Sequence, residues 1–306
     1  MAVPAGRVTQ DSQLPGFDLI AASWTTAGAC SPGPLSPDDS SPVPIRRRVE
    51  AARRAGFNGF GLRHSDLAKV ERDIGYAGFR TLLDDSGISH LELEFLEGWY
   101  ETGEARAALD VRRYRLLRAA EALGARHIKV GPKLSGGPFE PEKIIPEFAK
   151  LASEAANAGT KVGLEPTAFA DLKTPEQGLQ IVRQAGHAAG GLFLDIWHTE
   201  RAGVDFASLA DIPATNITGV ELADASAEFE GSLIDDTFNS RKFPGEGDFD
   251  VPGFVQAIRR TGYTGPWGVE MVSTEFRKLA VEEAARRAFA SSIRFLDGSG
   301  EWQARR

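Results

Sequence analysis

The sequence predicts an α/β fold in which a single (β/α)₈ TIM barrel occupies residues 1–306. Three observations predict it. One unit recurs along the chain: a helical pattern that ends in Gly, a few polar residues, and then a short apolar stretch. Eight such apolar stretches alternate with helical patterns, which is typical of a parallel sheet. The length of 306 residues suits one closed barrel of this kind.

The expected strands lie in eight segments that follow one another along the chain. These segments are residues 17–24, 55–63, 86–95, 123–131, 158–166, 190–198, 216–224 and 261–271. Helical patterns between them include residues 45–56, 111–124, 141–159 and 279–296. A doubly wound sheet is the alternative fold, but the first turn lacks the G-x-G-x-x-G pattern that such sheets usually carry. The barrel is therefore favoured.

Two segments are too long to be plain connections. Residues 25–44 are rich in Ser, Pro and Gly and follow the first strand, and residues 225–250 follow the seventh. Both therefore belong to the edge of the barrel at which the strands end, where such barrels place their chemistry. Because loops of this length are usually functional or disordered, we expect these two to form a lid or a pocket wall.

The composition limits the class of protein. Apolar residues make up 42% and charged residues 25%, as in a soluble globular protein. The net charge of −8 argues against a nucleic-acid partner. The only cysteine, Cys30, excludes disulfides within the chain and a cysteine-based metal cluster. No apolar run approaches the roughly 20 residues of a membrane span, and the N-terminus lacks an apolar signal core. We therefore expect a cytoplasmic protein with no membrane partner.

Acidic residues stand at the downstream ends of four apolar stretches. They are Glu165 in KVGLEP, Asp195 in GLFLDIWH, Glu221 in ITGVELAD and Glu270 in PWGVEMVS. Parallel barrel strands all end at one edge, so these four carboxylates are expected to converge. One such acid could simply cap the next helix, but four in register indicate a divalent-metal site. Oxygen ligands favour Mn²⁺, with Mg²⁺ or Co²⁺ as alternatives, and the shortage of histidine disfavours Zn²⁺.

Further polar residues near the same edge are candidates for binding substrate. His198 follows Asp195 by three residues and could ligate the metal, support a ligand or donate to a substrate hydroxyl. His64 ends the apolar stretch in GLRH and Lys129 lies within HIKVG, and each could contact substrate or form a surface salt bridge. Arg241 precedes a Pro-Gly turn and could bind a substrate oxygen or orient a carboxylate. A solvated charge is the alternative for Arg241.

Aromatic residues and the other histidines complete the set of candidates. Trp24, Trp99 and Trp197 could stack on a sugar face, although aromatic residues near a barrel mouth often only pack. Three histidines precede strands, and we expect structural roles for them at the opposite edge: His90, His127 and His187.

The combined pattern resembles the xylose isomerase-like TIM barrels over nearly the whole chain. The pattern is Glu at the end of the fifth strand, D-x-x-H at the sixth, V-E-L-A-D at the seventh, R-x-x-P-G-x-G and V-E at the eighth. This resemblance implies four metal ligands, and it also implies that His198 and Arg241 belong to the site. The implied ligands are Glu165, Asp195, Glu221 and Glu270. Many epimerases of the family carry His on strand seven, whereas this chain carries Glu221.

The resemblance implies a function as well as a fold. The family includes sugar isomerases and epimerases, inosose dehydratases, hydroxypyruvate isomerases and 3-dehydroshikimate dehydratases. A divalent-metal-dependent isomerase or epimerase would act on a ketose or keto-sugar through an enediolate, with Glu165 and Glu270 as the acid/base pair. The alternative is a lyase or dehydratase, in which the same enolate expels a β leaving group from a 3-keto sugar or keto-glycoside, including C- or O-glycoside cleavage.

Two other classes of protein share this fold. Abasic-site endonucleases of the superfamily need many histidines and a basic groove, whereas this chain has five histidines and is acidic. A non-catalytic sugar-binding barrel is the remaining alternative, because a fold does not imply an activity. The expected partner is a small carbohydrate substrate, with a homo-oligomer or a small accessory subunit as further candidates.

Overall fold

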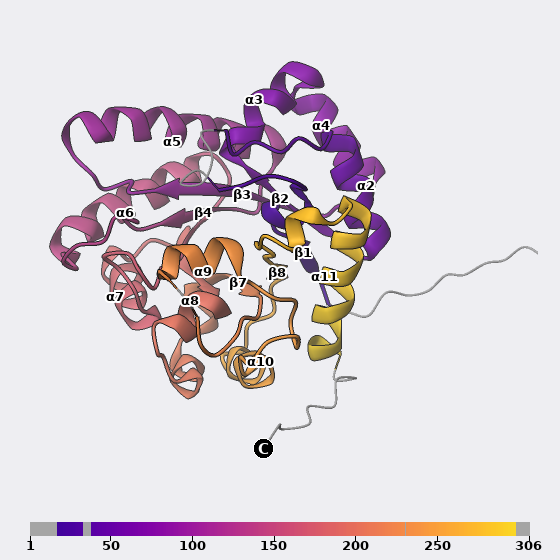
Figure 1. The fold of residues 1–306 in the computed structure, drawn as a ribbon. Helices are drawn as coiled ribbons and strands as arrows, with labels where there is room; N and C mark the ends of the chain where they lie inside the picture. The colour runs from indigo at the N-terminus through magenta and orange to yellow at the C-terminus, as the bar shows by residue number, and fades with distance from the viewer. Residues whose placement is uncertain (1–16, 33–37, 230, 298–306) are drawn as a thin grey trace, which may run out of the picture.

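The computed structural model describes residues 17–32, 38–229 and 231–297 of the chain. Within them, eight parallel strands form a closed barrel in sequence order, and β1 pairs with β8 (Figure 1). The strands are β1 Leu19–Ala21, β2 Gly59–Arg63, β3 His90–Glu97, β4 His127–Gly131, β5 Val162–Leu164, β6 Gly190–Asp195, β7 Ile217–Leu222 and β8 Trp267–Val269. The (β/α)₈ fold class predicted from the sequence is confirmed.

Helices surround the barrel and cover its strands (Figure 1). They are α1 Ser23–Thr26, α2 Ile45–Ala55, α3 His64–Asp73, α4 Gly75–Asp85, α5 Gly103–Leu123, α6 Pro141–Asn157, α7 Pro175–Ala185, α8 Ile196–Arg201, α9 Leu233–Asn239, α10 Val251–Arg260 and α11 Val281–Leu296. Short 3₁₀ turns are η1 Phe206–Asp211, η2 Ala214–Asn216 and η3 Phe276–Lys278. Because α11 packs against α2, the last described helix meets the beginning of the ring.

Glycines stop the helices close to where the sequence predicts. Gly56 and Gly124 cap α2 and α5 in the left-handed region, at φ 117° and 63°. That region has no steric cost for Gly. The sixth unit differs from the prediction, because α7 ends at Gly186 (φ 61°) and Gly190 already belongs to β6.

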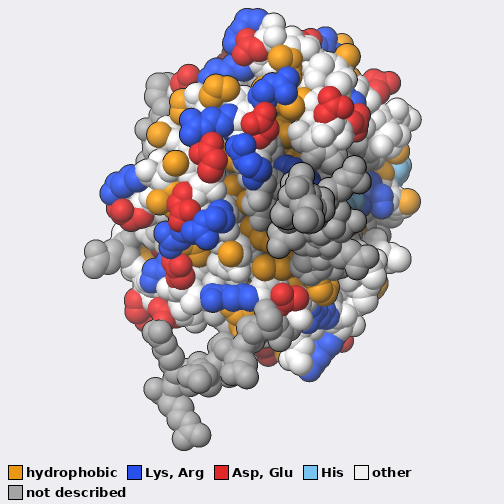
Figure 2. Space-filling model, turned by 90° about the vertical axis from the view of Figure 1, so that its right-hand side faces the viewer, with side chains coloured by type: hydrophobic (Ala, Val, Ile, Leu, Met, Phe, Trp, Pro, Cys, Tyr) orange, Lys and Arg blue, Asp and Glu red, His pale blue; other side chains and the backbone are white. Residues whose placement is uncertain are grey.

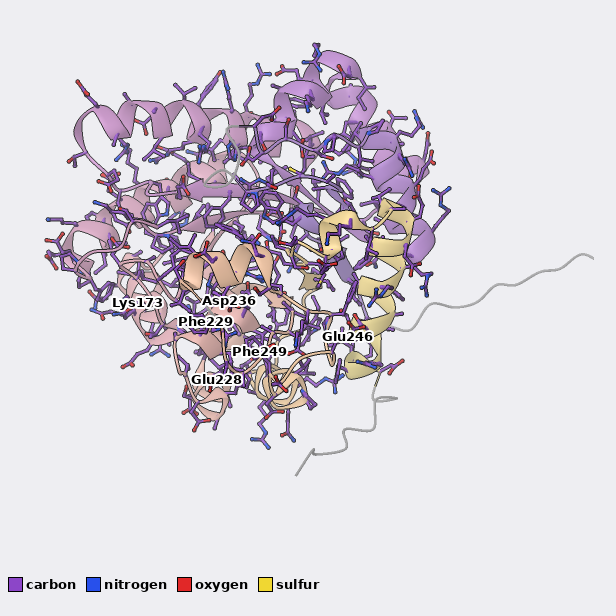
Figure 3. All side chains as sticks on the ribbon, in the orientation of Figure 1. Lys173, Glu228, Phe229, Asp236, Glu246 and Phe249 are labelled. Carbon is purple, nitrogen blue, oxygen red and sulfur yellow. The ribbon has the colours of Figure 1, made fainter. Side chains whose placement is uncertain are left out.

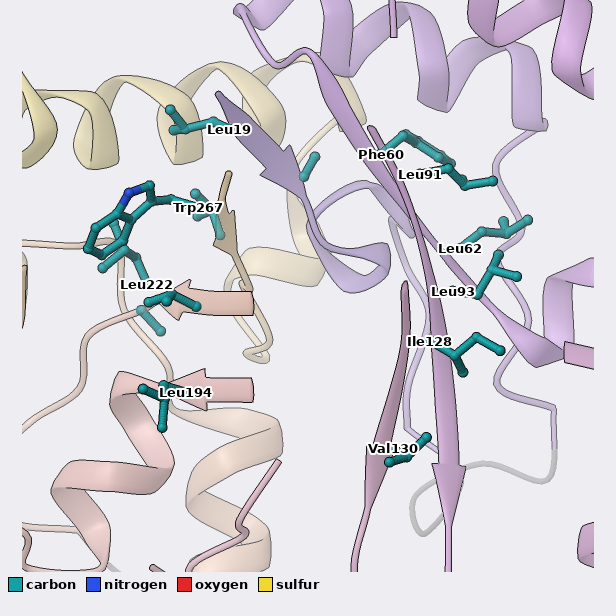
Figure 4. Close-up of a cluster of buried hydrophobic side chains, with 14 of the residues drawn as sticks. Leu19, Phe60, Leu62, Leu91, Leu93, Ile128, Val130, Leu194, Leu222 and Trp267 are labelled. Atoms are coloured by element: carbon teal, nitrogen blue, oxygen red, sulfur yellow. The ribbon is translucent and has the colours of Figure 1, made fainter. Parts of the chain in front are cut away.

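Strand β3 alternates between an apolar outer face and a charged inner face. Leu91 and Leu93 of β3 are buried in the main hydrophobic core, between the barrel and the helices (Figure 4). Glu92 and Glu94 occupy the intervening positions of the same strand and are also buried. Successive side chains of a strand point to opposite faces, so the charged residues of β3 lie inside the barrel.

The long segment after β7 contains helix α9 and is joined to α8 by contacts of Arg201. The guanidinium of Arg201 in α8 donates to Asp236 Oδ2 at 2.8 Å. The same guanidinium lies 4.9 Å from the ring centroids of both Phe229 and Phe249, and Figure 3 labels these three partners in the same part of the molecule. The segment at 25–44 includes the last two residues of α1, Thr25 and Thr26, and its residues 33–37 lie outside the described ranges.

Helix α5 begins eight residues earlier than the predicted range 111–124. The face that carries α2 and α11 mixes acidic and basic side chains without a patch of one sign (Figure 2), and Arg47 pairs with Glu282 across these two helices. Among the described residues, no helix combines the length and apolar character that crossing a membrane requires.

Candidate metal centre and substrate cavity

Five carboxylates converge at the mouth of the barrel, where the strands end. Together with two basic side chains they form what we call the carboxylate cluster: Glu94, Lys129, Glu165, Asp195, Glu221, Arg241 and Glu270. Ion pairs join the members, and every member is buried. The structure therefore brings together the four acids that the sequence singled out and adds Glu94 to them.

Lys129 lies at the centre of this cluster. Its Nζ donates to Oε1 and Oε2 of Glu221, at 3.0 and 2.8 Å, and to Oε1 of Glu270 at 2.9 Å. Glu94 Oε2 is 3.3 Å away and Glu165 Oε1 is 3.8 Å away. The predicted contact between Lys129 and substrate stays a prediction, but the ammonium already has carboxylate partners on several sides.

Arg241 is the second cation of the cluster and pairs with Asp195 and Glu270. It donates from Nη1 to Asp195 Oδ2 at 2.8 Å, and its Nη2 is 3.1 Å from Glu270 Oε2. Asp195 also accepts a hydrogen bond at Oδ1 from the backbone of Trp197, at 2.7 Å, which caps α8. Asp195 therefore caps a helix and also belongs to the cluster, and its role as a metal ligand stays a prediction.

The two glutamates expected to act as acid and base have opposite electrostatic environments. Burial opposes ionisation of Glu270, but Lys129 and Arg241 outweigh it and lower its pKa to about 2. Burial raises the pKa of Glu165 well above its ordinary value, and Lys129 offsets this only in part. Burial lowers the pKa of His198 to about 4, which favours a neutral imidazole. Pairs of titratable groups whose pKa values are pushed apart are typical of acid/base sites.

Residues of the cluster fit a divalent cation by charge and by geometry. Five carboxylates meet two cations, which leaves three negative charges unbalanced when all five are ionised. Two groups of side chains place candidate ligand atoms within 4.8 Å of one another: Glu165, Asp195 and His198, and Asp195, Glu221 and Glu270. Among the described residues, Glu165 Oε1 and His198 Nδ1 are buried without a hydrogen-bond partner. Such atoms are costly to bury unless something binds them.

A cavity of about 650 Å³ opens onto the cluster. Glu165, Glu270 and His198 line it, as do Lys129 and Arg241. His64 and Trp24 line it too, in agreement with their predicted position near the site. Trp197 does not line the cavity, because its ring is buried and lies against His198 and Arg241, with centroid distances of 4.9 and 5.3 Å.

Both long segments contribute to the wall of this cavity. Pro32 and Asp39 come from the segment after β1, and Thr237 and Phe238 from the segment after β7. A further part of the lining is apolar and includes residues from the first turns of α5. It is formed by Phe95, Ala105, Ala108, Leu109, Leu134 and Phe169.

Sequence reasoning missed Glu94. Its Oε1 accepts from the backbone nitrogen of Ser23 at 2.7 Å, and it also lines the cavity. The signal was present in HLELEF, because Leu and Glu alternate there with the period of a strand. A charged residue at every second position of a buried strand indicates a charged barrel interior.

The histidines expected at the opposite edge lie away from the cavity lining. His127 Nε2 is 2.6 Å from Glu92 Oε2, and both side chains are buried inside the barrel. His90 Nε2 is 2.9 Å from Asp18 Oδ2 at the start of the barrel. His187 accepts a hydrogen bond from the backbone of Ala189.

Comparison with known proteins agrees with this architecture. A family profile described as xylose isomerase-like TIM barrel matches residues 49–297. The chain belongs to this family. A solved structure described as the IOLI protein with a bound zinc atom superimposes with a TM-score of 0.81 at 20% identity, covering 94% of this chain and all of that one.

Curated relatives of the chain include enzymes of two kinds. Over 239 residues it is 29% identical to a 3-dehydroshikimate dehydratase of Pseudomonas aeruginosa, covering 76% of this chain and 37% of the dehydratase. Over 252 residues it is 24% identical to an inosose isomerase of Bacillus velezensis, covering 80% of this chain and 89% of the isomerase. The chain thus spans less than two fifths of the dehydratase.

Proposed function

We propose that this protein is a divalent-metal-dependent isomerase or epimerase that removes the proton next to the carbonyl of a ketose or keto-sugar. The observation that carries the proposal is the pair Glu165 and Glu270, which face one cavity and differ in electrostatic environment. Family membership and relatives described as inosose isomerases support it. The cytoplasmic location expected from the sequence belongs to the same proposal.

The metal would be held by the carboxylate cluster. Asp195 belongs to both groups of candidate ligands, and Glu165, His198, Glu221 and Glu270 supply the others. Bound there, a divalent ion acts as a Lewis acid that makes the C–H next to a carbonyl more acidic. The excess of carboxylate oxygens favours Mn²⁺, with Mg²⁺ or Co²⁺ as alternatives.

The chain's own residues would then move the proton. Glu270 is kept ionised by Lys129 and Arg241 and would accept the proton at a carboxylate oxygen, while the same two cations lower its basicity. Glu165, whose burial favours the protonated form, is suited to return a proton to the neighbouring carbon or to the other face. Arg241 fixes the position of Glu270, and His198 lines the cavity where it could donate to a substrate hydroxyl.

Elimination is the second candidate reaction, and two observations favour it. The relatives matched at 28–29% identity are dehydratases. The cavity of about 650 Å³ extends from the cluster along the apolar wall at α5, and pockets of about 300–1,000 Å³ commonly hold ligands of drug size. A substituent β to the carbonyl would find room beside Phe95 and Leu109 and would leave from the same enolate.

The test follows deuterium from solvent into substrate. Protein stripped of metal and reloaded with Mn²⁺ would be incubated in D₂O with ketoses, inososes and 3-keto glycosides, and each reaction followed by NMR. Deuterium next to the carbonyl with an intact carbon skeleton is expected for isomerisation or epimerisation. Loss of water or of an aglycone would establish the elimination instead.

The control is Glu270→Gln, which keeps the size of the side chain and removes the base. Exchange or elimination should disappear in this variant, and the Mn²⁺ content of the same sample shows whether proton transfer or metal binding was lost. Exchange that persists unchanged in Glu270→Gln, or no exchange with any substrate in the wild-type protein, would contradict the proposal.

A further inference from the structure

Asp224 is a buried carboxylate, outside the carboxylate cluster, that binds backbone nitrogens of the segment after β7. It is the second residue after that strand and is completely buried. Its Oδ1 accepts from the backbone nitrogens of Ala225 and Phe249, at 2.8 and 3.1 Å. Its Oδ2 accepts from those of Gly245 and Gly247, at 2.8 and 2.9 Å. Because three of these four donors belong to residues 245–249, the carboxylate closes the turn that this segment forms.

The residues of this turn make room for the carboxylate. A Cβ added at Gly247 would lie 2.2 Å from Oδ1 of Asp224 and 2.3 Å from the carbonyl oxygen of Ala225, which is closer than such contacts occur. Gly245 has φ 83°, in the region that Gly enters without steric cost. These two glycines are those of R-x-x-P-G-x-G, the pattern that begins at Arg241. The pattern therefore has glycine where the turn comes close to Asp224.

The backbone of Asp224 also holds the chain beside Arg241. The backbone nitrogen of Lys242 donates to the carbonyl oxygen of Asp224 at 2.7 Å, and that of Asp224 donates to the carbonyl oxygen of Lys242 at 3.0 Å. On the other side of Arg241, Ser240 forms an antiparallel bridge with Ser273, which follows β8. Two bridges thus flank Arg241 and hold its backbone between the ends of β7 and β8.

The guanidinium of Arg241 lies against two carboxylates of the cluster. Arg241 is 3% exposed, and it donates from Nη1 to Asp195 Oδ2 at 2.8 Å, while its Nη2 lies 3.1 Å from Glu270 Oε2. Nη2 also donates to Thr237 Oγ1 at 3.0 Å. Because a guanidinium is planar and its donors are fixed in one fork, it meets these groups together only when its backbone is held in place. The bridge to Asp224 is one of the two that hold it.

The outer side of the turn is held by contacts that water reaches. Glu246 pairs with Arg287 of α11 at 3.0 Å, and their side chains are 49% and 37% exposed (Figure 3). Arg294 of the same helix donates to the carbonyl oxygen of Pro244 at 2.7 Å. Exposed ion pairs contribute little, whereas hydrogen bonds to a buried ionised carboxylate are among the strong ones. The inner contacts with Asp224 therefore contribute more to the shape of the turn.

We propose that Asp224 is a positioning residue that holds Arg241 in the carboxylate cluster by closing the turn at residues 243–249. This inference rests on the function proposed above, in which Arg241 fixes the position of Glu270. Working geometry in such sites depends on supporting hydrogen bonds behind the residues that meet the substrate. The aspartate of V-E-L-A-D and the glycines of R-x-x-P-G-x-G thus act together, because one carboxylate binds the backbone of both segments.

Three variants separate this role from a general effect on folding. Asp224→Asn keeps the size of the side chain but places an amide donor against backbone N–H groups. Glu246→Gln is the matched control, because it makes the same chemical change on the same turn at an exposed position. Gly247→Ala disturbs the carboxylate from the other side of the contact and leaves Asp224 unchanged.

The measurement is the rate at which phenylglyoxal modifies Arg241, followed by mass spectrometry of the peptide. Arg48 is the internal reference, because it is equally buried and lies outside the turn. Loss of hydrogen bonds to a charged acceptor should raise the Arg241 rate at least about tenfold in Asp224→Asn and in Gly247→Ala. The Arg48 rate should stay unchanged, as should both rates in Glu246→Gln. Folded Asp224→Asn protein with the wild-type Arg241 rate would overturn the inference.

The wild-type protein provides a second readout that needs no variant. The backbone amides of Gly245, Gly247 and Phe249 should exchange with solvent deuterium as slowly as those of the barrel strands, because a buried carboxylate binds them. NMR measures this exchange residue by residue. Fast exchange at these amides would also overturn the inference.

Both readouts use protein without added metal or substrate, so they do not depend on the proposed activity. If Arg241 responds as expected but the wild-type protein transfers deuterium to no substrate, the proposed function fails and the positioning role stands. If the wild-type protein transfers deuterium and Asp224→Asn does so at the same rate, the positioning role fails and the function stands.

Discussion

Two buried ionic groups lie close together in this barrel and differ in how their charges balance. In the first group, Arg48 of α2 donates to Oδ2 of Asp66 in α3 at 2.6 Å. It also donates to the hydroxyl oxygens of Ser23 and Thr26, each at 3.2 Å. The other oxygen of Asp66 accepts from the backbone of Ser41 at 2.8 Å. One cation meets one carboxylate, and both oxygens of that carboxylate are bound.

The carboxylate cluster at the barrel mouth lacks this balance. Five carboxylates share Lys129 and Arg241, and Glu165 Oε1 has no hydrogen-bond partner among the described residues. Burial is similar in the two groups, so burial alone does not separate structure from function. The two groups differ in the number of carboxylates for each cation, because a buried carboxylate without a full cationic partner is costly to ionise unless a ligand compensates its charge.

The largest expected effect is a loss of kcat when Glu270 of the carboxylate cluster is replaced. Glu270→Gln should lower kcat by about 10³-fold, within the range for loss of a general acid or base, because the amide cannot accept the proton. Thermal unfolding should change little. Rate and melting temperature measured on the same preparation check this, and a variant with near-normal kcat would remove Glu270 from the mechanism.

The balanced pair should respond in the opposite way. Arg48→Met leaves Asp66 buried and unpaired, which should lower the free energy of unfolding by about 3–5 kcal/mol. The double variant Arg48→Met/Asp66→Leu should recover most of this loss and bind Mn²⁺ like wild type. Urea denaturation measures both variants. Equal losses in the single and double variants would show that the pair is not a closed structural unit.

Mn²⁺ should raise the free energy of unfolding only by binding to the carboxylate cluster. Mn²⁺ at 100 times its Kd should raise the free energy of unfolding by about 2.7 kcal/mol, and the Arg48→Met/Asp66→Leu variant should gain the same amount. Glu165→Gln should gain much less. Calorimetric melting with and without Mn²⁺ tests this, and an equal gain in Glu165→Gln would place the ion elsewhere.

A smaller effect is expected from His64, which lines the cavity and lies two residues from Asp66. Burial, Arg112 and Arg63 lower its pKa to about 3, whereas the unfolded chain should titrate near pH 6.5. Below that pH the unfolded state binds a proton that the folded state does not. Stability should therefore fall as the pH drops from about 6.5 toward 3, by at most about 2 kcal/mol at pH 5.

The matched variant for this effect is His64→Gln. Its stability should depend less on pH between 7.5 and 5 than that of the wild-type protein, as measured by urea denaturation at each pH. Identical pH dependence in the two proteins would show that His64 does not control the difference between folded and unfolded states.

Much of the fold could be predicted, because its signals are local. Glycines that end helices and short apolar stretches predicted all eight strands. Because the strands are parallel, Glu165, Asp195, Glu221 and Glu270 then lie at one edge of the barrel. The start of α5 was missed because residues 103–110 continue the helix with alanines and charges rather than an apolar stripe. Such residues favour helix without showing which face packs.

The roles of single side chains were harder to predict, because they depend on contacts across the barrel. Lys129 could have been a surface residue or a substrate contact, and the ion pair with Glu221 joins residues 92 positions apart. Trp197 was expected near a sugar. Its backbone nitrogen instead donates to Asp195 at the start of α8, and its ring is buried. Local pattern specifies position along a strand, whereas long-range packing decides what each side chain touches.

The central claim is that the unbalanced carboxylate cluster binds one divalent cation. Elemental analysis after dialysis against Mn²⁺ would compare wild type, Asp195→Asn and Arg48→Met/Asp66→Leu. The account predicts one Mn²⁺ per chain in the wild type and in the double variant, and a large loss in Asp195→Asn. A wild-type protein without bound metal, or an Asp195→Asn variant that keeps it, would contradict the claim.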